Sequence, residues 1–259
     1  MTEVRTEPRP GPVRTWWDGR YGRGLLLEVS LLLLLLTLYR LGRYLGRDQV
    51  VAAFDHAHDV VDFERWAGFA NERWLQQRAL DHLVLVRVLN RYYATVHFPA
   101  TAAFLVLAYI KAPAVYRNVR AILVSVTAAG LAMHIAYPLA PPRMLPGFVD
   151  TVAVFGPSIY DRPGVASVAN QYAAMPSLHV GWALIVAYGT YCMWTGWKRW
   201  IGTVHLVITT IAVVITANHY WLDAIVAFAL VGGALVGLRR WRASEPLQPS
   251  FDMVTGPMV

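Results

Sequence analysis

Residues 200–238 read WIGTVHLVITTIAVVITANHYWLDAIVAFALVGGALVGL, and Asp223 is the single residue among them with a formal charge. A helix needs about 20 predominantly apolar residues to cross a bilayer. The stretch is long enough for two such helices, joined at a polar centre, residues 218–223. We therefore expect two membrane-spanning helices here, near residues 199–217 and 219–238.

The composition of the whole chain is that of a membrane protein. Hydrophobic residues make up 56% of its 259 residues and charged residues only 15%, whereas a soluble domain usually carries about 25% charge. Further apolar runs predict helices near residues 24–42, 92–111, 119–138 and 176–196. The expected fold class is an all-α integral membrane protein with six transmembrane helices.

Short basic loops predict the orientation of these helices. Lys111, Arg117 and Arg120 lie between the second and third helices, Lys198 and Arg199 lie between the fourth and fifth, and three arginines follow the sixth. Short loops rich in Lys and Arg stay in the cytoplasm. Both termini are therefore expected in the cytoplasm of a multi-pass cell-membrane protein. The net charge of +7 fits this topology and anionic lipid better than nucleic acid.

The segment between the first two helices is long and nearly neutral. Within it Phe54, Ala57 and Val61 recur at helical spacing, and aspartates alternate with them. We expect helices that lie at the outer membrane interface. The chain then divides into a cytoplasmic tail (1–23), a first helix with outer interfacial helices (24–91), a catalytic membrane domain (92–240) and a second cytoplasmic tail (241–259).

Polar residues gather at the outer ends of four expected helices. The third helix ends in Tyr137-Pro-Leu-Ala-Pro-Pro-Arg143, the fourth begins with Ala174-Met-Pro-Ser-Leu-His179, and the fifth and sixth meet at Asn218-His-Tyr-Trp-Leu-Asp223. With six spans, all three segments lie at one depth on the extracytoplasmic side. We expect them to form one site.

The residue types in these segments suit phosphoryl transfer. His219 and Asp223 share a helical face, so the carboxylate can accept the Nδ1–H and leave Nε2 as a nucleophile. His179 can act as an acid, and Ser177 stands at a helix N-terminus that favours an anion. Arg143 offers a planar fork that matches phosphate oxygens.

Other interpretations of these residues stay open. Two histidines and an aspartate can form a metal triad, but Arg143 beside a cation would be repelled, so we expect no metal. A histidine at a membrane interface can be purely structural, and Arg143 can bind lipid headgroups alone. A non-catalytic lipid-binding or transport protein is the alternative of another class, although the paired charges within spans that transport favours are nearly absent.

The polar segments resemble motifs of the phosphatidic acid phosphatase type 2 superfamily, over roughly residues 90–240. Met175-Pro-Ser-Leu-His179 is similar to the Pro-Ser-Gly-His motif, with Leu178 in place of Gly, and His219-x-x-x-Asp223 is similar to the end of another motif. Ala212 and Val213 stand where that motif has Ser-Arg. Ala136 stands where a Lys would precede Arg143. These departures look like the branch with inositol phosphorylceramide and sphingomyelin synthases, as do the segments Asn90-Arg-Tyr-Tyr-Ala-Thr-Val-His97 and Ala217-Asn-His-Tyr220.

The resemblance implies an activity and a role for each residue. His219 would attack a phosphate ester, Asp223 would orient it, and His179 would protonate the leaving group. Arg143 and Ser177 would hold the phosphoryl oxygens. The implied protein is a membrane lipid phosphatase or phosphotransferase that works through phosphohistidine without a cofactor. Its partners would be a lipid phosphate substrate and membrane lipids.

The residues around the motifs bear on whether the phospho-group passes to water or to a second lipid. Aromatic residues near the motifs, and the missing motif Arg, favour transfer of a phospho-headgroup between lipids. The alternative is a simple lipid-phosphate or polyprenyl-(di)phosphate phosphatase. Residues expected to support the site from outside the motif positions are His97, Asn218, Tyr220 and Tyr172.

Overall fold

The computed structural model describes residues 49–156 and 171–244, together with Leu26, Glu28, Ser30, Leu33 and Thr37, which are helical. Most of the expected first span, near 24–42, lies outside these residues, as does the first tail. In the described ranges the chain is helical, and its one β-type pairing is an isolated bridge between Leu139 and Ala173. The helices are α3 (Val50–Trp66), α4 (Glu72–Leu80), α5 (Leu83–Thr95), α6 (His97–Lys111), α7 (Pro113–Ala136), η2 (Pro142–Met144), α8 (Thr151–Phe155), α9 (Leu178–Met193), η3 (Gly196–Trp200), α10 (Ile201–Ile215) and α11 (Trp221–Ser244).

Several described helices are long and apolar enough to cross a membrane. Three meet this criterion: α7, the continuous stretch Gly196–Ile215 formed by η3 and α10, and α11. The pair α5 and α6 would make a fourth span, bent by 45°. Helix α9 is apolar but, with 16 residues, shorter. The described part of the chain therefore supports a membrane protein with three or four spans.

The bent pair corrects the expected single helix near 92–111. The helical stretch begins earlier, at Leu83, and breaks at Val96. Pro99 explains the break, because it has no N–H to donate to the carbonyl of Thr95 and its ring crowds that carbonyl. The second expected span is thus two helices joined at an angle.

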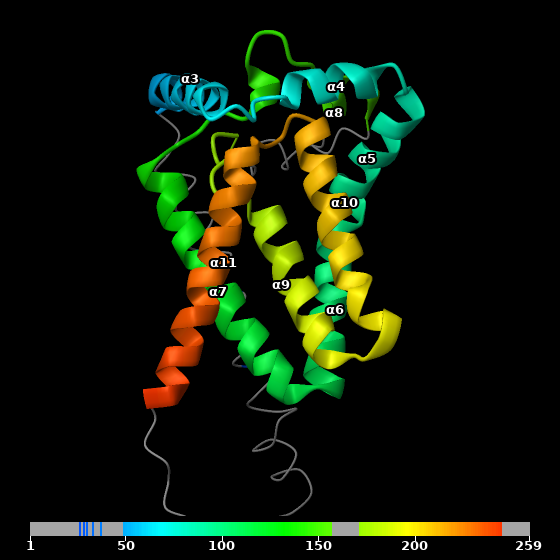
Figure 1. Ribbon diagram of the computed structural model, residues 1–259, viewed down its shortest axis with the longest axis vertical. Coiled ribbons are helices and arrows are strands. Elements are labelled where there is room, and N and C mark those ends of the chain that lie inside the picture. The colour runs from blue at the N-terminus through cyan, green and yellow to red at the C-terminus, as the bar shows by residue number, and fades with distance from the viewer. Residues whose placement is uncertain are drawn as a thin grey trace, which may run out of the picture.

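Helix α9 is the centre of the bundle and packs against α6, α7, α10 and α11 (Figure 1). Small residues let its neighbours approach. At Gly202 on α10, an added Cβ would lie 2.7 Å from the Cα of Ala187 on α9. Only a residue without a Cβ fits so close a crossing. The closeness of α9 and α10 matters for function because both helices lead directly to polar segments of the expected site.

Helices α3 and α4 run across the end of the bundle where α11 begins (Figure 1). On α3 the aspartates Asp55, Asp59 and Asp62 are exposed, as the helical spacing predicted. The buried face of α3 contains Ala53, Ala57, Val60 and, unexpectedly, Glu64. The two helices therefore cover the end of the bundle that holds the polar segments.

The opposite end of the bundle carries basic residues. Helix α6 ends at Lys111, and Arg120 lies near the start of α7. The carboxylate of Glu28 contacts the guanidinium of Arg120 and accepts a hydrogen bond from the hydroxyl of Tyr116 at 2.8 Å. The one acidic residue that interrupts the leucine-rich stretch near the N-terminus is thus paired at this basic end.

Candidate active site

The structure brings together the three polar segments that follow α7, precede α9 and join α10 to α11. The amide of Ala174 donates to the carbonyl of Leu139 at 3.3 Å. The amide of Arg143 donates to the carbonyl of Ala217 at 2.8 Å. These backbone bonds fix the three segments to one another before any side chain is considered.

His219 and Asp223 form a buried pair at the start of α11. The imidazole Nδ1 lies 3.1 Å from Asp223 Oδ2 and 2.8 Å from the carbonyl oxygen of Ala174. Both partners are acceptors, so Nδ1 carries the hydrogen and Nε2 carries the lone pair. Asp223 Oδ2 also accepts a hydrogen bond from the amide of Tyr220 at 2.9 Å. One carboxylate therefore fixes both the imidazole and the turn that carries it.

The environment of His219 keeps its imidazole neutral. His219 lies in the turn between α10 and α11, and only 6% of it is exposed. Burial, helped by the positive charge of Arg143, lowers the pKa of His219 to about 3, although the hydrogen bond with Ala174 acts in the opposite direction. A neutral imidazole is the form that can act as a nucleophile.

His179 lies in the first turn of α9, with its ring centroid 5.8 Å from that of His219. Ser177, two residues before His179, is the N-cap of α9. Its hydroxyl oxygen accepts a hydrogen bond from the amide of Val180 at 3.4 Å. Ser177 is fully buried, and its amide donates to the carbonyl of Asp223 at 3.2 Å. The start of α9 is therefore fastened to the start of α11.

Arg143 lies on η2 and is anchored beside the turn that carries His219. Its Nη1 donates to Asn218 Oδ1 at 2.8 Å, and its Nε lies 3.3 Å from Asp150 Oδ2. Asn218 in turn donates from Nδ2 to Thr216 Oγ1 at 2.7 Å. Ala217, between them, has φ +54°, a left-handed conformation that costs free energy for a residue other than glycine. Backbone strain is thus stored next to the proposed nucleophile.

The residues expected to support the site lie at different distances from its centre. The hydroxyl of buried Tyr220 donates to the carbonyl of Ala140 at 2.9 Å, which ties the turn that carries His219 to the segment after α7. Tyr172 is partly buried, and its ring meets the edge of Phe54 on α3. Asn218 binds Arg143, as described above. Tyr220 and Asn218 therefore support the centre directly, whereas Tyr172 packs beneath α3.

His97 approaches the centre through His179. Its ring centroid is 4.9 Å from that of His179 and 5.3 Å from that of His205, with which it stacks. His97 is 1% exposed, and neither ring nitrogen has a hydrogen-bond partner among the described residues. His205 Nδ1 lies 2.5 Å from the hydroxyl of Tyr92. A row of imidazoles thus runs from the site into the bundle.

Two buried carboxyl groups that are absent from the expected site also reach this region. Glu64 on α3 and Glu72 on α4 accept hydrogen bonds from the amides of Leu222 and Trp221 at 2.8 and 3.2 Å. A signal for Glu64 was present in the sequence, because it follows Ala57 and Val60 on the apolar face of an amphipathic helix.

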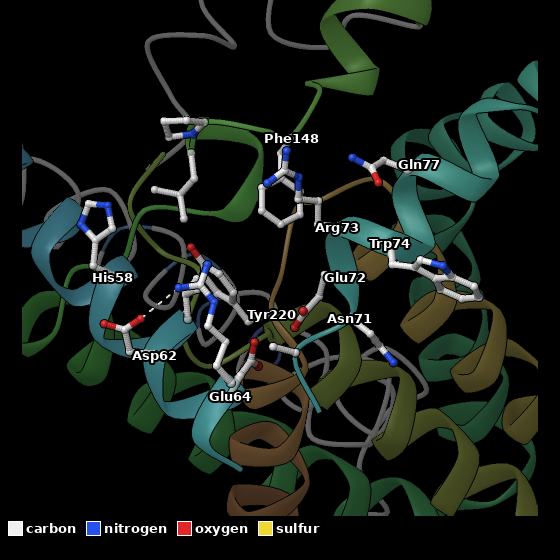
Figure 2. A pocket seen from close by; sticks show the side chains of 15 residues that line it. His58, Asp62, Glu64, Asn71, Glu72, Arg73, Trp74, Gln77, Phe148 and Tyr220 are labelled. Atoms are coloured by element: carbon white, nitrogen blue, oxygen red, sulfur yellow. Dashed lines mark hydrogen bonds and ion pairs between the residues drawn. The ribbon is translucent and has the colours of Figure 1, made fainter. Parts of the chain in front are cut away.

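A cavity of about 530 Å³ lies outside the start of α11, between α3, α4 and residues 145–148. Figure 2 shows Glu64, Glu72 and Tyr220 around its inner end and the side chain of Arg73 above them. His219, Asp223, His179 and Arg143 do not line it. Among the described residues no group of three or more His, Cys, Asp or Glu side chains is arranged to hold a metal ion.

The range matched by a known protein family includes the residues of this site. A sequence model of the PAP2 superfamily matches residues 58–237, more than half of the chain. The match extends from the middle of α3 to the last part of α11 and so includes the polar segments and both buried glutamates. No curated protein and no solved structure matches the chain.

Proposed function

The chain belongs to the PAP2 superfamily, and from this premise we propose that it transfers a phospho-group from a membrane lipid through a phosphohistidine at His219. Membership of the superfamily gives the broad class, a lipid phosphatase or phosphotransferase. The observation that carries the finer proposal is the buried His219–Asp223 pair, which engages Nδ1 and leaves Nε2 for phosphorus, in a ring whose centroid lies 5.8 Å from that of His179.

The first step forms a bond between His219 Nε2 and phosphorus and breaks the phosphorus–oxygen bond to the lipid alcohol. Asp223 holds the Nδ1–H and balances the positive charge that develops on the ring. His179 gives its proton to the leaving oxygen. In the second step a hydroxyl oxygen attacks phosphorus, the Nε2–phosphorus bond breaks, and His179 takes up the hydroxyl proton.

Arg143 and Ser177 hold the phosphoryl oxygens in this proposal. The guanidinium of Arg143 is held by Asn218 and Asp150, which orients a planar donor beside the turn that carries His219. The hydroxyl of Ser177 accepts from Val180 and still has its own hydrogen to donate. His97, Tyr220, Asn218 and Tyr172 support these groups from further out. The reaction needs neither a metal nor a cofactor.

Transfer to a second lipid is favoured over hydrolysis. Tyr220 beside His219 and Met175 before α9 are both buried, which supports a site that restricts water. Ala212 and Val213 replace the Ser-Arg of the motif. The same departures support a place near the inositol phosphorylceramide and sphingomyelin synthase branch.

We also propose the six-span topology with both termini in the cytoplasm and the site on the extracytoplasmic face. The catalytic membrane domain then corresponds to residues 92–240, with α3 and α4 at the outer interface. Support comes from the short basic connections between helices, which lie at the end of the bundle opposite the polar segments (Figure 1).

The proposal is tested with purified protein in lipid vesicles and a phospholipid donor that carries labelled phosphate. Diacylglycerol, ceramide and polyprenol are offered in turn as acceptors, and His219→Ala protein is the control. We expect a labelled lipid product with one acceptor, and an acid-labile phosphoenzyme in the wild type that the variant lacks. Labelled inorganic phosphate as the sole product would overturn transfer in favour of hydrolysis. Full activity of the variant would overturn the nucleophile, and absence of any product would favour a lipid-binding protein.

A further inference from the structure

Helix α11 begins without the usual capping residue of its own. The first amide groups of a helix have no carbonyl partners within it and are commonly satisfied by a Ser, Thr, Asp or Asn at the N-cap. Here the amide of Tyr220 donates to Asp223 Oδ2, which belongs to the first turn. The next two amides, of Trp221 and Leu222, donate to side chains of Glu72 and Glu64. Two partners far away in the sequence therefore replace the cap.

These two carboxyl groups are buried, and they come from the helices that cross the end of the bundle. Glu64 is 1% and Glu72 is 4% exposed. The backbone at the end of α3 also turns around Glu64, because the amides of Phe69 and Ala70 both donate to its carbonyl oxygen. Burying two carboxyl groups is costly unless each is hydrogen-bonded. The hydrogen bonds that Glu64 and Glu72 accept from the first amide groups of α11 explain why these carboxyl groups can be buried.

The raised pKa of Glu64 indicates a proton shared in a hydrogen bond between the two carboxyl groups. Burial is the main cause that raises the pKa of Glu64, and a hydrogen bond with Glu72 and the charges of Glu72 and Asp223 act in the same direction, to about 9. The hydrogen bond from Leu222 acts against them. The neutral Glu64 thus holds the proton of the pair. Other titratable or charged groups around the same cavity are His58, Asp62, Arg65, Arg73 and Tyr220.

We propose that Glu64 and Glu72 are positioning residues that hold the His219–Asp223 pair in its reactive geometry by fixing the first turn of α11. This inference rests on the proposed function. Only Tyr220 separates His219 from the two capped amides, and Asp223 follows them directly, so a shift of this turn displaces the imidazole and the carboxylate together. A misplacement of about 1 Å by a substitution away from the chemistry can cost about 10²-fold in rate.

Glu64→Ala and Glu72→Ala are compared with Glu64→Gln and with Asp62→Asn. The Gln side chain keeps an acceptor for the Leu222 amide and a donor for Glu72, whereas Ala keeps neither. Asp62 is an exposed acidic residue of the same helix and serves as the matched control. We expect kcat to fall about 10²-fold in both Ala variants with KM little changed, and Glu64→Gln and Asp62→Asn to stay near the wild type.

The pH profile of activity, measured at a temperature at which the wild type and the variants all stay folded, gives a second readout. As pH rises through about 9, the pair in the wild type loses its shared proton, and two adjacent negative charges repel each other. Activity of the wild type should fall there, whereas Glu64→Gln should keep its activity. If the wild type and Glu64→Gln decline in parallel above pH 9, the shared proton has no role and the inference fails.

Hydrogen exchange of the peptide that spans residues 216–225 separates this inference from the proposed function. We expect faster exchange in Glu64→Ala and Glu72→Ala and the wild-type rate in Asp62→Asn. A wild-type protein that transfers or releases no phosphate would overturn the proposed function. The exchange rates would still test whether Glu64 and Glu72 stabilise the first turn of α11. Ala variants with unchanged exchange and unchanged kcat would overturn the positioning role.

Discussion

His219 uses a single ring nitrogen for both of its polar contacts. Nδ1 is shared between the carbonyl oxygen of Ala174 and Asp223 Oδ2, so the backbone and the carboxylate select the same tautomer. With Nε2 committed to phosphorus, His219 cannot also protonate the leaving oxygen. That proton has to come from another residue. The imidazole of His179 contacts the ring of His219 and is placed to supply it.

The first prediction tests His179 as the acid. Replacing His179 with Gln should lower kcat/KM for a lipid phosphate ester about 10²- to 10⁴-fold, the usual contribution of general acid catalysis. An ester with a nitrophenol leaving group needs no protonation and should lose much less. The measurement is kcat/KM for both esters with wild-type and variant protein. Equal losses on the two esters would contradict the acid role.

The second prediction concerns the pH dependence of stability. Glu64 has its pKa raised from 4.5 to about 9 in the folded protein, so the unfolded chain releases a proton that the folded chain keeps. This group therefore stabilises the fold most at low pH, and its contribution is lost as pH rises from 4.5 to about 9. The midpoint of thermal unfolding should fall more steeply with pH in the wild type than in Glu64→Gln.

Asp62→Asn is the control for this measurement, because Asp62 lies on the same helix but is exposed. Its unfolding midpoint should follow that of the wild type across the range. Curves for the wild type and Glu64→Gln that run parallel from pH 4.5 to pH 9 would show that Glu64 is not protonated in the fold.

At the scale of helices, charge-poor runs were enough to predict α7, α10 and α11, because a buried or lipid-facing helix excludes unpaired charges. The bend between α5 and α6 did not follow from the composition of that run, since a single Pro99 sets it. Glu64 was missed for a different reason. A carboxyl group on an apolar face becomes understandable only when its partners, here the first amides of α11, are known.

The third prediction concerns the crossing of α9 and α10. Gly202→Ala should lower the free energy of unfolding by about 1–3 kcal/mol, the usual cost of overpacking, because the new Cβ would press on the backbone of α9 at Ala187. Gly237→Ala on α11 is the control, since a Cβ there meets no atom within 4 Å. The control should be neutral or raise stability by up to about 1 kcal/mol.

Thermal unfolding of both glycine variants in the same detergent measures the difference. A Gly202→Ala protein as stable as Gly237→Ala would mean that α9 and α10 are less close than the structure has them.

At the scale of the whole molecule, the polar motif segments and the short basic connections lie at opposite ends of the bundle. The candidate site lies at the end covered by α3 and α4, and the short basic connections lie at the other (Figure 1). The sequence predicted this separation because the motif segments and the basic loops alternate along the chain. It could not supply the contacts within the site, such as that between Arg143 and Asn218, because residues 75 positions apart form them.

The fourth prediction tests which end faces outward. The chain has one cysteine, Cys192, which is exposed, so it is first replaced by Ser. A cysteine is then placed at Val154 on α8, 62% exposed at the site end, or at Trp197 on η3, 73% exposed at the basic end. Because short basic segments stay in the cytoplasm, an impermeant thiol reagent should label Val154→Cys in intact cells and should label Trp197→Cys only after the membrane is opened. Labelling of Trp197→Cys alone in intact cells would place the site in the cytoplasm, and the donor lipid would then have to come from the inner leaflet.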